Sequence, residues 1–367
     1  MGVFKNDVGR PSNETLRKRN IIRIIIAVAI IAIISIIIIF VKNKTTMSVS
    51  FKPKYIKDNV NSELKDVYAF TLNSYGSTLN GQTNEIMALT KDNKLIKLTS
   101  IQQNNPITSM AYYDSKLYFK TDDEYGDYIV DIDLTKGNGN YEVEDSGIEF
   151  SENEDGDEIV PMDFDIVDGI MYFTSAWDSY LRSYDLKTKK IEIIDGSLSD
   201  GSYDFDIHYN FVDKTSKKIY YQRRDSKALY SYDITNKQKK KLSDEWMNLE
   251  LYFNGTASYL SSDESKTIIY DTQTDEKKVL DNSSECINDG VKYICNDGDR
   301  IYTIDGNNEN TILKANKNES FADIVGLLDN NKMVITVGYD GNKIVDLSKK
   351  KIVDNNPKIS NFIYYVY

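Results

Sequence analysis

The sequence predicts an all-β protein, a β-propeller of four-stranded blades, behind one N-terminal transmembrane helix. Three observations carry this prediction. The 367 residues include 27 tyrosines and only 5 prolines, a composition that favours ordered β structure over disorder. One strand pattern recurs along most of the chain from residue 67 onward. A single uncharged apolar run, from Ile24 to Val41, precedes the repeats.

Charge is distributed unevenly along the chain. The formal net charge is −12, yet residues 1–23 carry six basic and only two acidic side chains. The rest of the chain is strongly acidic, which argues against a general nucleic-acid binder because such a protein needs a basic face. A basic head in front of an acidic body points to a membrane protein.

The apolar run is long enough to cross a membrane. With residues 21–23 it makes 21 residues, or about 31 Å of helix against a hydrocarbon core of about 30 Å. A cleaved signal peptide has a shorter apolar region with a small-x-small site close behind it, whereas Ser48-Val49-Ser50 lies too far downstream. A buried core helix would need an equally apolar partner, and the sequence has none. We therefore expect an uncleaved anchor at residues 21–41.

The flanking charges set the expected topology. Basic residues lie on both sides of the anchor, and the tighter cluster is N-terminal, within residues 17–23. We expect a single-pass cell-membrane protein with a cytoplasmic head at residues 1–20. A stalk without periodicity follows at residues 42–64. The propeller at residues 65–367 is then outside.

The repeat consists of a short apolar strand with a tyrosine, a second strand that ends in Asp, and a Lys-rich third strand. The copies, broadly from clearest to weakest, are 117–133, 171–185, 219–233, 258–271, 292–305, 333–346 and 67–90. Residues 65–367 divide into seven units of about 43 residues, within the roughly 40–50 of a four-stranded propeller blade. Seven blades fit best, with six or eight as alternatives.

Each recurring residue type has a structural interpretation. A tyrosine at one repeat position can fill the space between neighbouring sheets. The terminal Asp can bond backbone N–H groups in the next turn, and Lys on an outermost strand opposes edge-to-edge pairing. The functional alternatives are a carboxylate array and a surface for an anionic wall polymer or lipid. The tyrosines are Tyr118, Tyr172, Tyr220, Tyr259 and Tyr293, and the aspartates are Asp133, Asp185, Asp233, Asp271, Asp305 and Asp346.

The C-terminal segment 359–367 is predicted to close the ring. It is strand-like, but no Asp-bearing strand follows it. Segment 107–119 has a similar strand immediately before its tyrosine. We therefore expect residues 359–367 to supply the innermost strand of the first blade.

The copies resemble the low-density-lipoprotein-receptor type of β-propeller, whose YWTD blades pair an aromatic strand with an Asp-bearing strand. The nearest match is MYFTSAWDSYLRSYDL, residues 171–186, and the resemblance spans roughly residues 67–353. Trp is missing from the motif and the spacing varies. The resemblance extends to bacterial single-span membrane proteins with such a propeller outside, a domain of unknown function. It implies a binding platform for a protein or glycan and transfers no catalytic residue.

Candidate catalytic residues are few. His208 is the only histidine, so a nucleophile–histidine enzyme would have to use it, and no GxSxG motif accompanies it. Asp165 and Asp206 occupy matching DFDI motifs, and both could face the central channel. A propeller hydrolase of the glycosidase kind, using these carboxylates, is the alternative to a non-enzymatic platform.

Metal and cysteine signals are weak. Asn153, Asp155 and Asp157 alternate as calcium ligands do, but the spacing does not fit an EF-hand, so a solvated loop is favoured over weak calcium binding. We expect no cofactor. Cys286 and Cys295 flank a hairpin signal at residues 288–290. They fit one disulfide outside the cell or two reduced, packed cysteines, and the sequence does not choose.

Overall fold

The computed structural model describes residues 54–55, 64, 67–77, 81–91, 94–103, 107–123, 126–136, 141–150, 159, 161–175, 180–196, 207–245, 247–306, 308–317, 319–329, 331–338, 341–354, 357, 359 and 363–365. All of them belong to one compact unit, Pro53–Tyr367. The expected head and the expected anchor at residues 21–41 lie outside the described residues. Within the described ranges, no helix is both long and apolar enough to cross a bilayer.

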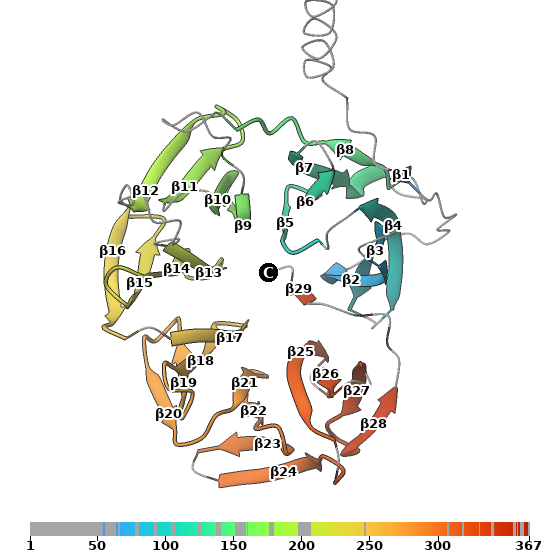
Figure 1. Cartoon of the computed structure of the whole chain (residues 1–367), viewed down its shortest axis with the longest axis vertical. Coiled ribbons are helices and arrows are strands. Elements are labelled where there is room, and N and C mark those ends of the chain that lie inside the picture. The colour runs from blue at the N-terminus through green and yellow to red at the C-terminus, as the bar shows by residue number, and fades with distance from the viewer. Residues whose placement is uncertain are drawn as a thin grey trace, which may run out of the picture. The chain divides into compact units, whose positions relative to one another are not determined.

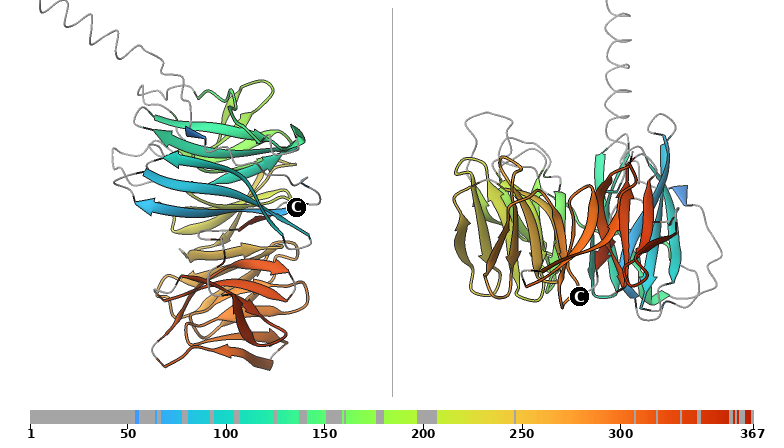
Figure 2. Two further views of the ribbon diagram at one scale, coloured as in Figure 1. Left: turned by 90° about the vertical axis from the view of Figure 1, so that its right-hand side faces the viewer. Right: turned by 90° about the horizontal axis from the view of Figure 1, so that it is seen from below.

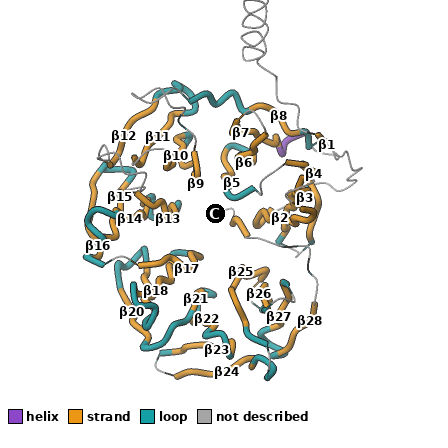
Figure 3. Tube along the Cα trace, in the orientation of Figure 1, coloured by secondary structure: helices purple, strands orange, loops and turns teal. Residues whose placement is uncertain are grey.

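Seven antiparallel sheets surround a common centre and form a seven-bladed propeller (Figure 1). The all-β prediction and the blade number of seven are therefore confirmed. Seen from the side, each blade is a twisted stack of strands (Figure 2). Apart from one short 3-10 helix, Leu134–Lys136, the described residues are strands and loops (Figure 3).

Six blades contain four consecutive strands each. Along the chain, these strands follow one another from the innermost to the outermost position. Blade 2 has β5 (Met110–Tyr113), β6 (Lys116–Asp123), β7 (Gly126–Asp133) and β8 (Val143–Asp145), and blade 3 has β9 (Pro161–Val167), β10 (Ile170–Ser175), β11 (Tyr180–Asp185) and β12 (Ile191–Gly196). Blade 4 has β13 (Ile207–Asp213), β14 (Lys218–Arg223), β15 (Ala228–Asp233) and β16 (Gln238–Ser243), and blade 5 has β17 (Met247–Phe253), β18 (Thr256–Ser261), β19 (Thr267–Asp271) and β20 (Lys277–Leu280). Blade 6 has β21 (Glu285–Asn288), β22 (Tyr293–Asn296), β23 (Arg300–Asp305) and β24 (Asn308–Lys314), and blade 7 has β25 (Phe321–Asp329), β26 (Lys332–Val337), β27 (Asn342–Asp346) and β28 (Lys351–Asp354).

Blade 1 combines both ends of the described chain. Its strands are β1 (Lys54–Tyr55), β2 (Val67–Ser77), β3 (Gly81–Thr90), β4 (Leu95–Gln103) and β29 (Ile363–Tyr365), in the order β1-β4-β3-β2-β29. The C-terminal β29 pairs antiparallel with β2, with Tyr364 opposite Phe70, and is the innermost strand of this sheet. The ring is thus held together within one sheet by strands from opposite ends of the sequence.

Two residues of the segment expected to be a stalk belong to the sheet of blade 1. Lys54 and Tyr55 form β1, which pairs with Gln102 and Ile101 on the outer edge of β4. An outermost strand offers unpaired backbone N–H and C=O groups, and β1 satisfies some of them. The missing side-chain periodicity of this segment could not reveal the pairing, because backbone groups make it.

Seven apolar clusters hold the blades together, one in each gap between neighbours. In the gap between blades 4 and 5, for example, Phe211 and Tyr220 pack with Tyr259 and Tyr270. The gap between blades 7 and 1 contains Ile363 of the C-terminal strand. Each sheet therefore buries both of its faces, as a propeller requires.

The single tyrosine position is correct for three blades and wrong for two. Tyr118, Tyr172 and Tyr220 each pair with the residue two before the terminal Asp. In blades 5 and 6 the residues at this register are Ser258 and Ile294. Tyr259 and Tyr293 lie one position away and so face the other side of their sheets, because side chains alternate along a strand. Tyr259 still fills a gap, facing Tyr220.

Among the described residues, five of the six repeated aspartates, all except Asp305, accept backbone N–H groups in the turns that follow them. Four of them accept the N–H two residues later at 2.8–2.9 Å: Asp133, Asp185, Asp233 and Asp271. Asp346 accepts the N–H three residues later at 2.9 Å. This is the Asx-turn geometry that the turn interpretation expects.

The lysines of the outermost strands reach across to neighbouring blades. Lys239 and Lys240 of β16 lie 2.7 Å from Asp195 of blade 3 and Asp275 of blade 5. Lys278 of β20 donates to a backbone carbonyl of blade 6 at 2.8 Å. These side chains thus link blades in addition to placing charge along the sheet edges.

Candidate functional site

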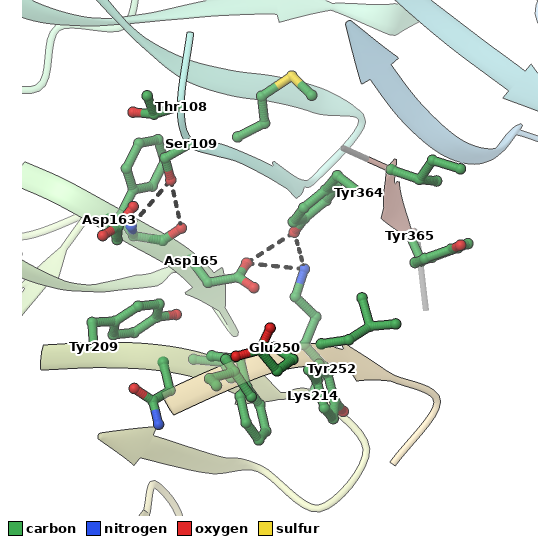
Figure 4. A pocket seen from close by; sticks show the side chains of 18 residues that line it. Thr108, Ser109, Asp163, Asp165, Tyr209, Lys214, Glu250, Tyr252, Tyr364 and Tyr365 are labelled. Carbon is green, nitrogen blue, oxygen red and sulfur yellow. Dashed lines mark hydrogen bonds and ion pairs between the residues drawn. The ribbon is translucent and has the colours of Figure 1, made fainter. Parts of the chain in front are cut away.

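A pocket of about 410 Å³ is lined by the innermost strands of blades 1 to 5 (Figure 4). Its walls come from β9, β13, β17 and β29, and from residues 108–110 at the start of blade 2. Successive side chains of a strand point to opposite faces of its sheet. Side chains from the innermost strands meet in this pocket. The pocket combines aromatic rings with several acidic groups and one lysine.

Asp165 lies in this pocket, and one of its carboxylate oxygens binds three groups. The Tyr364 hydroxyl donates to Asp165 Oδ1 at 2.9 Å, and Lys214 Nζ lies 3.1 Å from the same oxygen. The N–H of Ile166 also donates to it, at 2.8 Å. Lys214 further donates to the Tyr364 hydroxyl, which accepts the N–H of Tyr112 at 3.1 Å as well. Asp165 therefore serves to tie the C-terminal strand to blades 3 and 4.

Tyr365 ties the same strand to blade 7. Its hydroxyl accepts the N–H of Leu327 at 2.7 Å and donates to the carbonyl of Leu327 at 3.0 Å. The neighbouring Gly326 has φ +154°, and a Cβ there would lie 2.4 Å from the Tyr365 hydroxyl. Only glycine leaves room for this close approach. Two consecutive tyrosines thus connect β29 to blades on both sides of blade 1.

Asp163 and Glu250 line the pocket without such partners. Both side chains are accessible to solvent, and neither has an ion pair or hydrogen bond within the described part of the chain. Protein surrounds them closely enough that desolvation raises the pKa of Asp163 and, with the nearby charge of Asp323, the pKa of Glu250. Asp163, Asp165 and Glu250 thus give the pocket wall three acidic groups against one lysine, Lys214.

Glu285 on β21 extends this acidic region. One of its carboxylate oxygens accepts the N–H of Ile324 on β25. Burial, reinforced by the charges of Asp323 and Glu250, raises the pKa of Glu285 to about 8. At neutral pH its carboxyl group is therefore mostly protonated and bridges blades 6 and 7 without charge.

Aromatic rings form the rest of the wall. Phe211 stacks on Tyr252 with ring centroids 3.9 Å apart and on Tyr220 at 4.7 Å. The hydroxyl of Tyr209 is buried at the pocket wall and has no hydrogen-bond partner among the described residues. Lys214 Nζ lies 4.8 Å from the centre of the Tyr364 ring. A cation is thus already held here between a carboxylate and an aromatic face.

The structure separates the residues that the sequence singled out. Asp165 is in the pocket, while Asp206 lies outside the described residues, so the spacing of the two carboxylates is not defined. His208 is on β13 but exposed, and it does not belong to the pocket wall. Partial desolvation of its ring, with the charge of Arg224, lowers the pKa of His208.

The remaining candidates are the calcium ligands and the two cysteines. Asn153, Asp155 and Asp157 lie outside the described residues. Within the described ranges, no group of three or more His, Cys, Asp or Glu side chains has the arrangement of a metal site. Cys286 and Cys295 are opposite each other on β21 and β22, with their sulfur atoms 2.12 Å apart, and form a disulfide.

Sequence reasoning missed Lys214, Tyr364 and Glu250 as pocket residues. Lys214 follows β13 in a loop, and the repeat says nothing about loops. Tyr364 could have been found, because the closure model makes its strand innermost and alternation then limits which residues face the centre. Glu250 looks like any exposed acid in an acidic chain.

No family model and no curated protein matches the chain. Similar solved structures include a nidogen/laminin complex, at 10% identity over 81% of this chain and 96% of that chain, with a TM-score of 0.42. The dihydro-heme d1 dehydrogenase NirN has 10% identity over 87% and 77%, with a TM-score of 0.49. An oligogalacturonate lyase in complex with manganese has 12% identity over 79% and 86%, with a TM-score of 0.44. At these values we draw no argument about ligand or activity from any of them.

Proposed function

We propose that the chain is a membrane-anchored, non-enzymatic binding platform whose propeller lies outside the cell and takes a protein or glycan ligand in the central pocket. The resemblance of the repeats to the low-density-lipoprotein-receptor-type propellers of bacterial single-span proteins supports the binding platform. The uncharged run from Ile24 to Val41 supports the anchor. The Cys286–Cys295 disulfide supports an oxidising location.

The state of Asp165 is the observation that carries the non-enzymatic role. Oδ1 of Asp165 binds Tyr364, Lys214 and its neighbour's N–H, and these bonds hold the C-terminal strand in place. A structural role therefore accounts for the carboxylate on which the hydrolase alternative depends. We infer from this role that the pocket recognises a bound group rather than cleaves a bond.

A capture experiment tests the platform. The full chain, purified in a mild detergent, is used as bait for solubilised cell-surface extract and for isolated wall polysaccharide. We expect Thr108→Trp to remove captured material, because Thr108 is exposed on the pocket wall and a large ring there fills the space. Thr274→Trp on an exposed outer turn is the matched control and should change nothing.

Two outcomes would contradict the proposal. One is capture that Thr108→Trp leaves intact, which would move the ligand away from the pocket. The other is turnover of ester, peptide or glycoside substrates by the purified chain that Asp165→Asn or His208→Gln abolishes. That result would replace the platform with an enzyme.

A further inference from the structure

The pocket contains one satisfied cation site. Lys214 Nζ lies 3.1 Å from the Asp165 carboxylate and 4.8 Å from the centre of the Tyr364 ring. A carboxylate supplies the opposite charge, and an aromatic face attracts a cation through its ring electrons. The carboxylate belongs to blade 3 and the ring to blade 1, and the cation belongs to the protein itself.

Carboxylates and rings occur together a second time, and here the charge of Lys120 acts on Asp163 without forming an ion pair with it. Asp163 on β9 and Glu250 on β17 line the pocket with no ion pair or hydrogen bond among the described residues. The rings of Tyr209 and Tyr252 line it beside them. Asp163, Asp165 and Glu250 outnumber the single lysine of the wall, so the space attracts positive charge.

The Tyr209 hydroxyl gives an independent indication of what is missing. It is buried at the pocket wall and has no hydrogen-bond partner within the described ranges. An orphaned buried polar group destabilises the fold, and a ligand that donates a hydrogen bond to the oxygen removes this cost. Ammonium and guanidinium groups carry only donors, so they suit both this oxygen and the two carboxylates.

We propose that the pocket binds an ammonium or guanidinium group of the ligand, between the carboxylates of Asp163 and Glu250 and the rings of Tyr209 and Tyr252. This inference rests on the proposed function and specifies its ligand. The group can come from a basic side chain of a protein partner or from a free amine. An uncharged or anionic glycan lacks it.

Matched probes test the charge requirement. The full chain in detergent is titrated with the blocked peptide Gly-Gly-Lys-Gly-Gly, with its Nε-acetyl-lysine form, and with spermidine, and binding is followed by ligand-detected NMR. We expect both cationic probes to bind and acetylation to weaken the peptide at least tenfold. Glu250→Gln and Asp163→Asn should each weaken the cationic probes severalfold, and the double variant at least tenfold.

Controls keep the result specific to the pocket. Glu276→Gln removes one negative charge from an exposed outer turn and should leave binding unchanged. Tyr209→Phe retains the ring and removes the orphaned oxygen, so it should weaken the cationic probes without lowering the melting temperature. A tighter peptide than spermidine assigns the cation to a protein partner, and the reverse order assigns it to a free amine.

The inference is overturned if the acetylated peptide binds as well as the charged one, or if the double variant binds the cationic probes like the unchanged chain. The platform itself can survive that result. Capture that Thr108→Trp abolishes but Glu250→Gln with Asp163→Asn leaves intact would mean an occupied pocket with an uncharged or anionic ligand.

Discussion

Glu285 makes the stability of the fold depend on pH. Its pKa of about 8 lies above the ordinary value of 4.5, so the folded chain holds the proton more tightly than the unfolded chain does. The stabilisation is fully present below pH 4.5 and is lost as the pH rises through about 8. Ionisation then places a charge beside Glu250 and Asp323 at the junction of blades 6 and 7.

We expect Glu285→Gln to reduce this loss. The amide can still accept the N–H of Ile324 and never ionises. Melting temperatures are measured at pH 5 and pH 9, and the drop should be a few degrees smaller in the variant, since 1 kcal/mol corresponds to about 2–4 °C in domains of 150–250 residues. Glu276→Gln is the control. Equal drops in the variant and the unchanged chain would contradict the raised pKa.

Single residues also show where sequence reasoning stops. The matching DFDI motifs allow Asp165 to face the channel, and the structure places it in the pocket. Its partner Lys214 lies in a loop and Tyr364 comes from the far end of the chain, so no local pattern links the three. Tyr259 and Tyr293 were assigned to the wrong register because a shift of one residue leaves the strand pattern recognisable while it reverses the face.

At the scale of elements, the repeat predicted strands well because each has a local cause. Apolar alternation marks the strand and the terminal Asp marks its turn, as the N–H bonds to Asp185 and Asp271 illustrate. β1 was missed for the opposite reason. Two residues that add backbone hydrogen bonds to the edge of β4 leave no trace in side-chain chemistry.

The hairpin of β21 and β22 offers a test of redox environment. Cys286 and Cys295 are 1% and 0% exposed, so reductants in solution reach them poorly. We expect chain extracted from membranes under a thiol-blocking reagent to carry no blocked cysteine unless it is first unfolded and reduced, as mass spectrometry will show. Loss of a disulfide typically costs about 2–5 kcal/mol, so Cys286→Ser with Cys295→Ser should lower the melting temperature.

Two blocked cysteines per chain, after extraction and unfolding without reductant, would contradict the disulfide. They would also remove one support for an external propeller, because disulfides persist in oxidising compartments. The apolar run at residues 24–41 would remain as the argument for an anchor. Glu285→Gln, which lies next to Cys286 but leaves both sulfur atoms unchanged, serves as the local control for the double serine variant.

At the scale of the whole molecule, the propeller depends on closure. Every gap between blades has an apolar cluster, and the cluster between blades 7 and 1 includes Ile363 of the last strand. Tyr364 contacts blades 2, 3 and 4, and Tyr365 contacts blade 7. The ring of Tyr365 also meets that of Phe253 in blade 5, so the three residues of β29 connect six of the seven blades when its own blade 1 is included.

We expect deletion of residues 359–367 to cause more damage than three strand residues suggest. The deletion leaves the edge of β2 unpaired and removes the tyrosine partners of Asp165 and Leu327. It also removes the part of the pocket wall that β29 supplies. Each buried group left unpaired costs about 1–3 kcal/mol, against a total stability of about 5–15 kcal/mol. The deleted chain should aggregate or melt far below the unchanged chain, as light scattering and calorimetry will show. Tyr364→Phe, which keeps the strand and removes one hydroxyl, should lower the melting temperature less, and deletion of residues 42–52 should not lower it. An unchanged melting curve after the C-terminal deletion would mean that the other interblade clusters hold the ring without its closing strand.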